Sequence, residues 1–128
     1  MFEVSIKARF SAAHHLVGYS GHCAVQHGHN WDVEVFVRGR KLNKTGILVD
    51  FQTIKETVRG VLGELDHSDL NTRQAFRKQN PTSENIARFL HKKLSKRLNS
   101  RDCKVSCVAV CETPESRARY WEEQAHHP

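Results

Sequence analysis

Residues 27–37 read His-Gly-His-Asn-Trp-Asp-Val-Glu-Val-Phe-Val, and this stretch determines the interpretation of the fold. Its β-branched and aromatic residues predict a strand over about residues 29–39. Side chains two positions apart on a strand point to the same face, so His27 and His29 are expected to lie side by side at its start. Gly28 between them carries no side chain that would crowd an incoming group.

The chain on either side of this stretch predicts an α+β fold. Residues 2–14 form a second alternating apolar run that ends at His14 and predicts another strand. Apolar residues at intervals of three and four predict amphipathic helices over about 52–65 and from the capping residue Thr82 onward. Strands at about 103–112 and 117–122 close the order β-β-α-α-β-β. Because strands and helices are segregated, we expect an antiparallel sheet with helices on one face.

Length and composition predict one domain over residues 1–128, with about 124–128 as a disordered tail. No run approaches the roughly 20 apolar residues of a membrane helix, and no basic segment with a long apolar run opens the chain, so we expect a cytoplasmic protein without membrane contact. The net charge of +6 indicates an anionic partner. Basic residues are scattered and no nucleic-acid-binding motif is present, which argues against nucleic acid.

Three histidines are the candidate metal ligands. His14 ends the first strand and could approach His27 and His29 from a neighbouring strand. Three neutral imidazoles suit Zn²⁺ and leave a fourth position open for substrate, which is typical of catalytic zinc. Most histidines in a chain with nine of them are only solvated or hydrogen-bonded, and His15 and His22 compete for the role of His14. We favour His14 because it ends the alternating run.

The four cysteines divide into two groups. Cys103, Cys107 and Cys111 lie among valines in a predicted core strand, where cysteine behaves as a small hydrophobic residue. Cys23 lies four residues before His27 and is the candidate functional thiol. Nothing indicates secretion, so disulfides are not expected.

Five motifs then occur in order along nearly the whole chain: Phe10-Ser11-Ala12-Ala13-His14, Cys23-x-x-x-His27-Gly28-His29-Asn30, Leu65-Asp66-His67-x-x-Leu70-Asn71, Pro81-Thr82-Ser83-Glu84-Asn85 and Glu112-Thr113. Together they resemble the 6-pyruvoyltetrahydropterin synthase family. The three-residue gap between Cys23 and His27 is similar to that of the 6-carboxytetrahydropterin synthase branch, since the pyruvoyl-forming branch typically has a wider gap.

The resemblance implies a tunnelling fold and a zinc enzyme. Each protomer is expected to form a four-stranded antiparallel sheet, three protomers a barrel, and two trimers a homohexamer with sites at subunit interfaces. The implied reaction converts 7,8-dihydroneopterin triphosphate to 6-carboxy-5,6,7,8-tetrahydropterin, with loss of acetaldehyde and triphosphate, on the route to queuosine. Zn²⁺ is the only cofactor implied, and the substrate is a small pterin triphosphate.

The resemblance also implies roles for individual residues. His14, His27 and His29 would hold zinc, and Cys23 would act as general base. Asp66 would orient His67 in proton transfer. Glu112 would accept two adjacent N–H groups of the pterin edge. Further contacts to the substrate are expected from Thr82 and Glu84, and the candidates for the triphosphate are Lys7, Arg9, Arg117 and Arg119.

Plainer interpretations remain beside these roles. Asp66 and His67 also suit a helix C-terminus, where the helix dipole favours a histidine. Glu112 also suits an ordinary charge at a strand end, and Thr82 and Glu84 suit the start of a helix. For the whole chain, the alternatives are the pyruvoyl-forming synthase, a non-catalytic zinc-binding module and a basic RNA-binding domain, whose affinity would fall steeply with salt.

Overall fold

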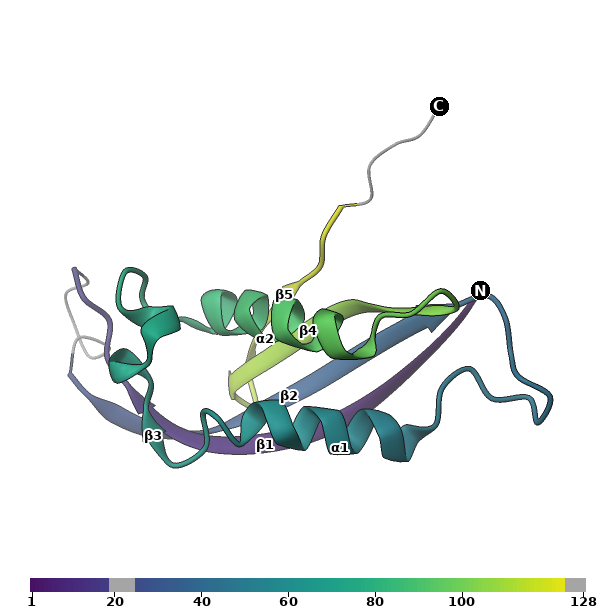
Figure 1. Cartoon of the computed structure of the whole chain (residues 1–128). Coiled ribbons are helices and arrows are strands. Elements are labelled where there is room, and N and C mark those ends of the chain that lie inside the picture. Colours follow the sequence, from purple (N-terminus) through teal and green to yellow (C-terminus); the bar gives the residue numbers. More distant parts are fainter. Residues whose placement is uncertain (19–24, 124–128) are drawn as a thin grey trace.

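Two long strands, β1 (Phe2–His14) and β2 (His27–Gly39), pair along their whole length in the computed structural model, which describes residues 1–18 and 25–123. The antiparallel register runs from Phe2 opposite Gly39 to His14 opposite His27. β4 (Cys103–Thr113) pairs antiparallel with β2, and β5 (Ser116–Tyr120) pairs antiparallel with β4 (Figure 1). The four predicted strands are therefore confirmed, as is the antiparallel arrangement among them.

A fifth strand makes the sheet mixed, so the expectation of a four-stranded, wholly antiparallel sheet is wrong. β3 (Ser68–Asp69) pairs in parallel with Ala12 and Ala13, and the strand order is β3-β1-β2-β4-β5. A strand of two residues has no alternating pattern that a sequence could display. It forms because the preceding turn is attached to β1, where the backbone N–H of His67 donates to the Ser11 carbonyl.

Two helices begin at side-chain caps. Asp50 accepts from the backbone N–H of Gln52 at the start of α1 (Phe51–Leu62), and Thr82 accepts from that of Asn85 at the start of α2 (Ser83–Leu98). The predicted capping role of Thr82 is thus confirmed, whereas α1 ends three residues before the expected residue 65. Two 3₁₀ turns, η2 (Leu70–Thr72) and η3 (Gln74–Phe76), lie between the helices. None of the described helices has the length and apolar character needed to cross a bilayer.

The hydrophobic core lies between the sheet and the two helices, which pack against each other and run along the strands (Figure 1). Alternate residues of β1, β2 and β4 are buried on this face. Trp31 is fully buried and stacks on Phe10 with 5.9 Å between ring centroids. Because each large side chain buried here contributes roughly 1.5–3 kcal/mol, this face holds the strand ends in place.

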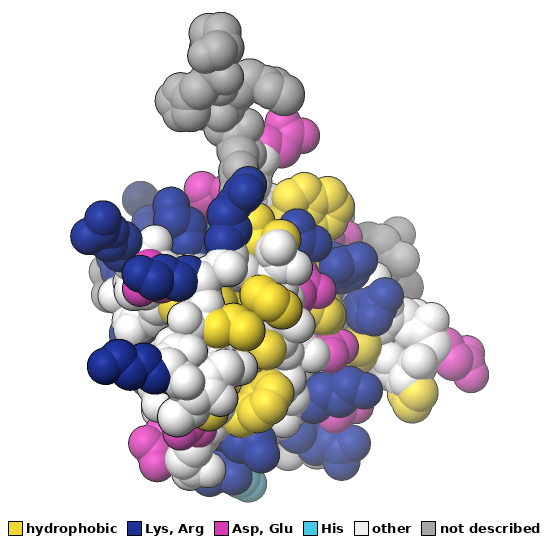
Figure 2. All heavy atoms as spheres, turned by 90° about the vertical axis from the view of Figure 1, so that its right-hand side faces the viewer, with side chains coloured by type: hydrophobic (Ala, Val, Ile, Leu, Met, Phe, Trp, Pro, Cys, Tyr) yellow, Lys and Arg dark blue, Asp and Glu magenta, His cyan; other side chains and the backbone are white. Residues whose placement is uncertain are grey.

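The opposite face of the sheet carries polar pairs instead of a helix layer. Arg9 Nε lies 2.7 Å from Asp32 Oδ1, and the Ser5 hydroxyl donates to Glu34 at 2.9 Å. At the N-terminal end of β1, hydrophobic side chains are ringed by Lys and Arg (Figure 2). The exposed large hydrophobic residues of the chain include Met1, Phe2, Ile47 and Phe51.

Candidate metal centre and catalytic residues

Four side chains from three neighbouring strands converge at the end of the sheet farthest from the N-terminus. His14 comes from β1, His27 and His29 from β2, and Glu112 from β4. Their ligand atoms all lie within 4.8 Å of one another. The antiparallel register brings this about, because it places His14 directly opposite His27 and Ala12 opposite His29. The structure therefore brings together the three histidines singled out in the sequence, and it includes His14 rather than His15.

Backbone carbonyls orient two of the three imidazoles. His14 Nδ1 lies 2.8 Å from the carbonyl oxygen of Pro81, at the approach to α2, and His27 Nδ1 lies 2.6 Å from that of Val25. An Nδ1–H that donates to a carbonyl leaves the Nε2 lone pair free for a metal, which is the usual arrangement of histidine ligands. Pro81 thus has a role in the site, although the sequence offered it only as part of a motif.

Burial keeps this cluster in the form that a metal needs. The His14 side chain is only 3% exposed and lies edge-on to Trp31, with ring centroids 4.8 Å apart. Burial lowers the pKa of His29 below its ordinary value, an effect that the Glu112 carboxylate opposes and the other two histidines reinforce. His29 is therefore neutral at pH 7, as a metal ligand must be.

The cluster fits a divalent metal such as zinc. His29 Nε2 is buried and forms no hydrogen bond with any described residue, although Glu112 Oε1 is 2.9 Å away. A buried polar atom without a partner is costly, and coordination to a metal would satisfy it. Three imidazole nitrogens and one carboxylate oxygen are all donors that zinc accepts.

Asp66 and His67 lie elsewhere, on the turn that leads into β3. Asp66 Oδ1 accepts from the backbone N–H of Ser11 at 2.8 Å, and Oδ2 lies 3.1 Å from His67 Nδ1. The bond from Ser11 lowers the pKa of Asp66 below its ordinary value, and His67 adds to this effect. Asp66 therefore remains ionised and able to orient the imidazole.

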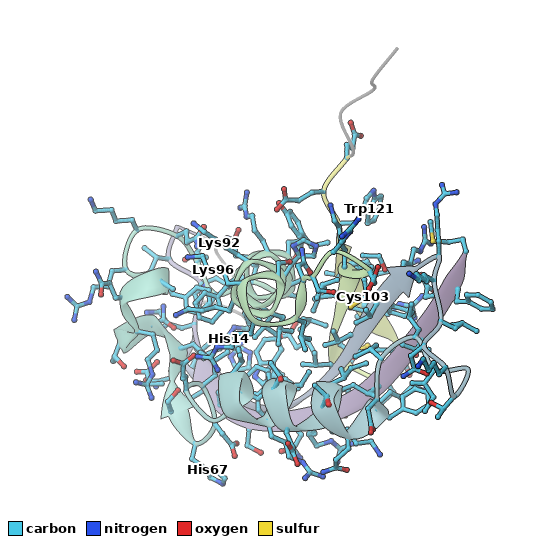
Figure 3. All side chains as sticks on the ribbon, turned by 45° about the vertical axis from the view of Figure 1, so that its right-hand side comes forward. His14, His67, Lys92, Lys96, Cys103 and Trp121 are labelled. Carbon is cyan, nitrogen blue, oxygen red and sulfur yellow. The ribbon has the colours of Figure 1, made fainter. Side chains whose placement is uncertain are left out.

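His67 projects into solvent, with its side chain 82% exposed, whereas His14 lies inside the molecule (Figure 3). Its φ of 56° is in the left-handed region, which is uncommon for a residue other than glycine. Ser11, to which this turn is attached, is three residues from His14, or roughly 10 Å along the strand. Within one chain, the Asp66–His67 pair and the histidine cluster therefore form two separate groups.

The remaining predicted site residues are placed as follows. Thr82 caps α2 immediately after Pro81, and Glu84 is exposed in the first turn of that helix. Glu112 contacts the histidines, where the sequence indicated only a pterin contact or a charge at a strand end. Cys23 and the competing His22 lie outside the described residues, as does the tail at 124–128.

Two asparagines hold the segment that follows His14. The Asn71 side chain accepts from the backbone N–H of His15 and donates to its carbonyl, and Asn80 forms the same pair of bonds with Val17. Each amide thereby replaces a strand partner. Asn71 stood in a quoted motif without a role, and neither contact could be read from the spacing of the residues.

A basic groove of about 440 Å³ runs along the edge of β1 beside α1. Its cations are Lys7, Arg9, Lys55 and Arg59, and Asp66 lies at its margin. Two of the four residues suggested for a triphosphate therefore share one surface. The other two, Arg117 and Arg119, lie on β5.

Comparisons with known proteins agree with this architecture. A family model described as 6-pyruvoyl tetrahydropterin synthase matches residues 3–123. The 6-carboxy-5,6,7,8-tetrahydropterin synthase of Bacillus subtilis is 33% identical over 126 residues, which cover 93% of this chain and 84% of that protein. The dihydroneopterin monophosphate aldolase of Pyrococcus furiosus is 42% identical over 72 residues, which cover 56% of this chain and 58% of that protein. The solved 6-pyruvoyl tetrahydropterin synthase of Caenorhabditis elegans is 27% identical, with a TM-score of 0.84 and coverage of 95% of this chain and 96% of that chain.

Proposed function

Because the chain belongs to the 6-pyruvoyl tetrahydropterin synthase family, we propose that it is a zinc-dependent lyase that converts 7,8-dihydroneopterin triphosphate to 6-carboxy-5,6,7,8-tetrahydropterin. Acetaldehyde and triphosphate are the other products. The reaction belongs to the cytoplasm and supplies queuosine biosynthesis. Among its relatives, the Bacillus subtilis protein carries the name of this enzyme and matches 93% of the chain.

The convergence of three imidazoles on one point is the observation that carries the proposal. His14 Nε2 lies 3.0 Å from His27 Nε2, and His29 Nε2 lies 2.9 Å from the same carboxylate oxygen that contacts His14. Two of the rings are fixed through Nδ1, so their Nε2 atoms are prepared for a metal before it binds. A site organised in this way suits catalysis by a bound metal better than a surface histidine pair would.

The metal and the protein groups have distinct tasks. When bound, zinc supplies Lewis-acid stabilisation of the negative charge that develops on the substrate side chain. Cys23 acts as the base that removes a proton from that side chain, as its thiolate. Asp66 holds His67 through Nδ1, which leaves Nε2 to exchange a proton with the substrate or with Cys23. Glu112 accepts the amino-pyrimidinone edge of the pterin.

Two copies of the chain are needed to complete this group. Asp66 and His67 lie roughly 10 Å along β1 from the cluster of the same chain, and His67 faces solvent. The outer edge of β1 before Ala12 and the outer edge of β5 have no strand partner among the described residues. Pairing of such edges between copies builds the three-membered barrel, and two barrels stack into a homohexamer. The turn of one copy then completes the cluster of the next.

The triphosphate contacts the basic groove of a neighbouring copy. Arg9 is five residues from His14, or roughly 17 Å along the strand, so the groove is too remote from the cluster of its own chain. In an assembly in which the turn carrying Asp66 reaches the next site, the groove beside that turn moves with it. Thr82 and Glu84 are then left to line the pterin pocket or to start α2.

The direct test is to incubate the zinc-loaded protein with 7,8-dihydroneopterin triphosphate and to identify the products by mass spectrometry. We expect 6-carboxy-5,6,7,8-tetrahydropterin and acetaldehyde. The Cys23→Ala variant is expected to lose turnover while it keeps its zinc. Cys107→Ala is the matched control, because Cys107 is a buried thiol on the polar face of β4 and should be dispensable. Full turnover by Cys23→Ala would exclude Cys23 as the base.

A second candidate activity is aldol cleavage of dihydroneopterin monophosphate. It is favoured by the 42% identity to the Pyrococcus furiosus aldolase, which extends over 56% of this chain. Turnover of the monophosphate alone would replace the proposed reaction with this one. A pyruvoyl product from the triphosphate would instead assign the chain to the reaction for which the family is named. A protein that binds zinc and leaves every pterin unchanged would be a binding module.

A further inference from the structure

Glu112 occupies the place of a fourth metal ligand. Its Oε1 lies 2.9 Å from His14 Nε2, 2.9 Å from His29 Nε2 and 3.7 Å from His27 Nε2, while the Nε2 atoms of His14 and His27 are 3.0 Å apart. Four ligands placed tetrahedrally at about 2.0–2.1 Å from a zinc ion are about 3.3–3.4 Å from one another. The observed separations lie on either side of this value, so the four atoms already approximate a tetrahedral shell.

Hydrogen bonding does not explain so many close contacts. Because His14 and His27 donate through Nδ1 to carbonyl oxygens, their Nε2 atoms in the neutral rings present lone pairs. The ionised carboxylate presents only lone pairs as well. One shared proton would relieve a single pair of these atoms, and His29 Nε2 would remain without a hydrogen bond. A metal ion at the centre satisfies all four atoms at once.

The backbone explains how Glu112 reaches the histidines. The register between β4 and β5 shifts between Cys111 and Thr113, so that Glu112 lies in an irregularity of the ladder. Irregularities of this kind redirect a side chain and often occur beside active sites. The Glu112 side chain is also 27% exposed, against 3% for His14, so it is the ligand with room to leave.

We propose that Glu112 is a displaceable fourth ligand, which closes the metal site while no substrate is bound and leaves the metal to bind the pterin edge when substrate arrives. The second half rests on the proposed function. One carboxylate needs both oxygens to accept two adjacent N–H groups, so ligation of the metal and binding of the pterin exclude each other. The exchange opens a coordination position only when the substrate is in place.

The test uses protein in which cobalt(II) replaces zinc, because the visible spectrum of cobalt reports its ligands. Without substrate, Glu112→Ala should alter the spectrum and bind zinc about tenfold or more weakly. The variant should also bind azide at the metal, whereas the wild-type protein should exclude it. Glu115→Ala is the matched control, since Glu115 is an exposed carboxylate in the turn after β4. The proposal is overturned if Glu112→Ala keeps the wild-type spectrum and zinc affinity, or if azide titrates both proteins alike.

A second measurement tests the exchange. Adding 7,8-dihydroneopterin to wild-type cobalt protein should change its spectrum, and the same addition to Glu112→Ala should bind at least tenfold more weakly. An unchanged wild-type spectrum at saturating pterin would overturn displacement. Failure of the proposed reaction is visible separately, as absence of product in the mass spectrum, because ligation by Glu112 is measured without turnover.

Discussion

The histidine cluster and the Asp66–His67 turn, the two parts of the proposed catalytic group, are built in opposite ways. The cluster is assembled on the covered face of the sheet from three strands, with its rings packed beside Trp31 and two of them held by carbonyl oxygens. The turn lies at the edge of the sheet, attached to β1 at Ser11, and it exposes its imidazole. One chain therefore completes the metal half but only displays the proton-transfer half.

This difference teaches that the two halves are free to change independently. Metal binding depends on register and burial within a chain, whereas proton transfer depends on what a second copy brings to the exposed turn. The left-handed backbone of His67 supports the same view, because strained residues are retained where they position a functional group. Variants in the two regions should consequently have separable effects.

The largest effect is expected from His14→Ala. Removing one of three imidazoles should weaken zinc binding on the order of 10²-fold or more and abolish turnover, because His14 is also the most buried ligand. Metal analysis after dialysis measures the loss. His15→Ala is the control, since His15 is adjacent but outside the cluster. Loss of metal from His15→Ala together with its retention in His14→Ala would reverse the assignment.

His67→Asn should separate the two regions most clearly. Asparagine tolerates the left-handed backbone that His67 adopts, so the turn should persist without its imidazole. We expect full zinc content and turnover lower by about 10²–10⁴-fold, the usual contribution of a general acid or base. Steady-state kinetics beside metal analysis provide both readings. Zinc loss in this variant would mean that the two regions are one site within the chain.

Mixing the two inactive variants tests whether a site is shared between copies. If His14→Ala and His67→Asn chains are unfolded, mixed equally and refolded with zinc, about a quarter of the sites should combine an intact cluster with an intact turn. Activity should then return to about that fraction of wild type. Refolding each variant alone provides the baseline. A mixture as inactive as its parts would place the whole catalytic group in one chain.

The smallest effect concerns the attachment of the turn to β1 and depends on pH. The pKa of Asp66 is lowered in the folded state, chiefly by the Ser11 N–H, so its contribution to stability is complete above the ordinary carboxyl value of about 3.9. It is lost as the pH falls through the lower, folded-state pKa. Urea unfolding with EDTA present should therefore show wild type more stable than Asp66→Ala at pH 6, with the difference shrinking towards pH 2. A difference that is independent of pH would exclude the ionised carboxylate as its source.

Residue patterns predicted much of the fold because each main element has its own period. Alternation located β1 and β2, and intervals of three and four located α1 and α2. β3 was missed because two residues form no pattern, and its pairing to Ala12 and Ala13 depends on where the preceding turn is attached. The end of α1 was placed three residues too late, because Leu65 continues the apolar spacing but lies in the turn beyond the helix.

The candidate site was predictable only in part, for similar reasons. His27 and His29 share a strand, so their common direction followed from spacing. The approach of Glu112 to the histidines did not, because it depends on the pairing of β4 with β2 and on an irregularity beside β5. The contact of His14 with Pro81 likewise joins residues 67 positions apart.

The sequence by itself determined the period of each main element, the family and the residue types that a metal and a pterin require, because these are local properties of order and chemistry. Only the tertiary structure decided that His14 rather than His15 joins the pair on β2, that Glu112 faces the histidines, and that His67 faces away from them. Those outcomes depend on strand register and burial, which arise when distant segments pack together. No single segment carries that information.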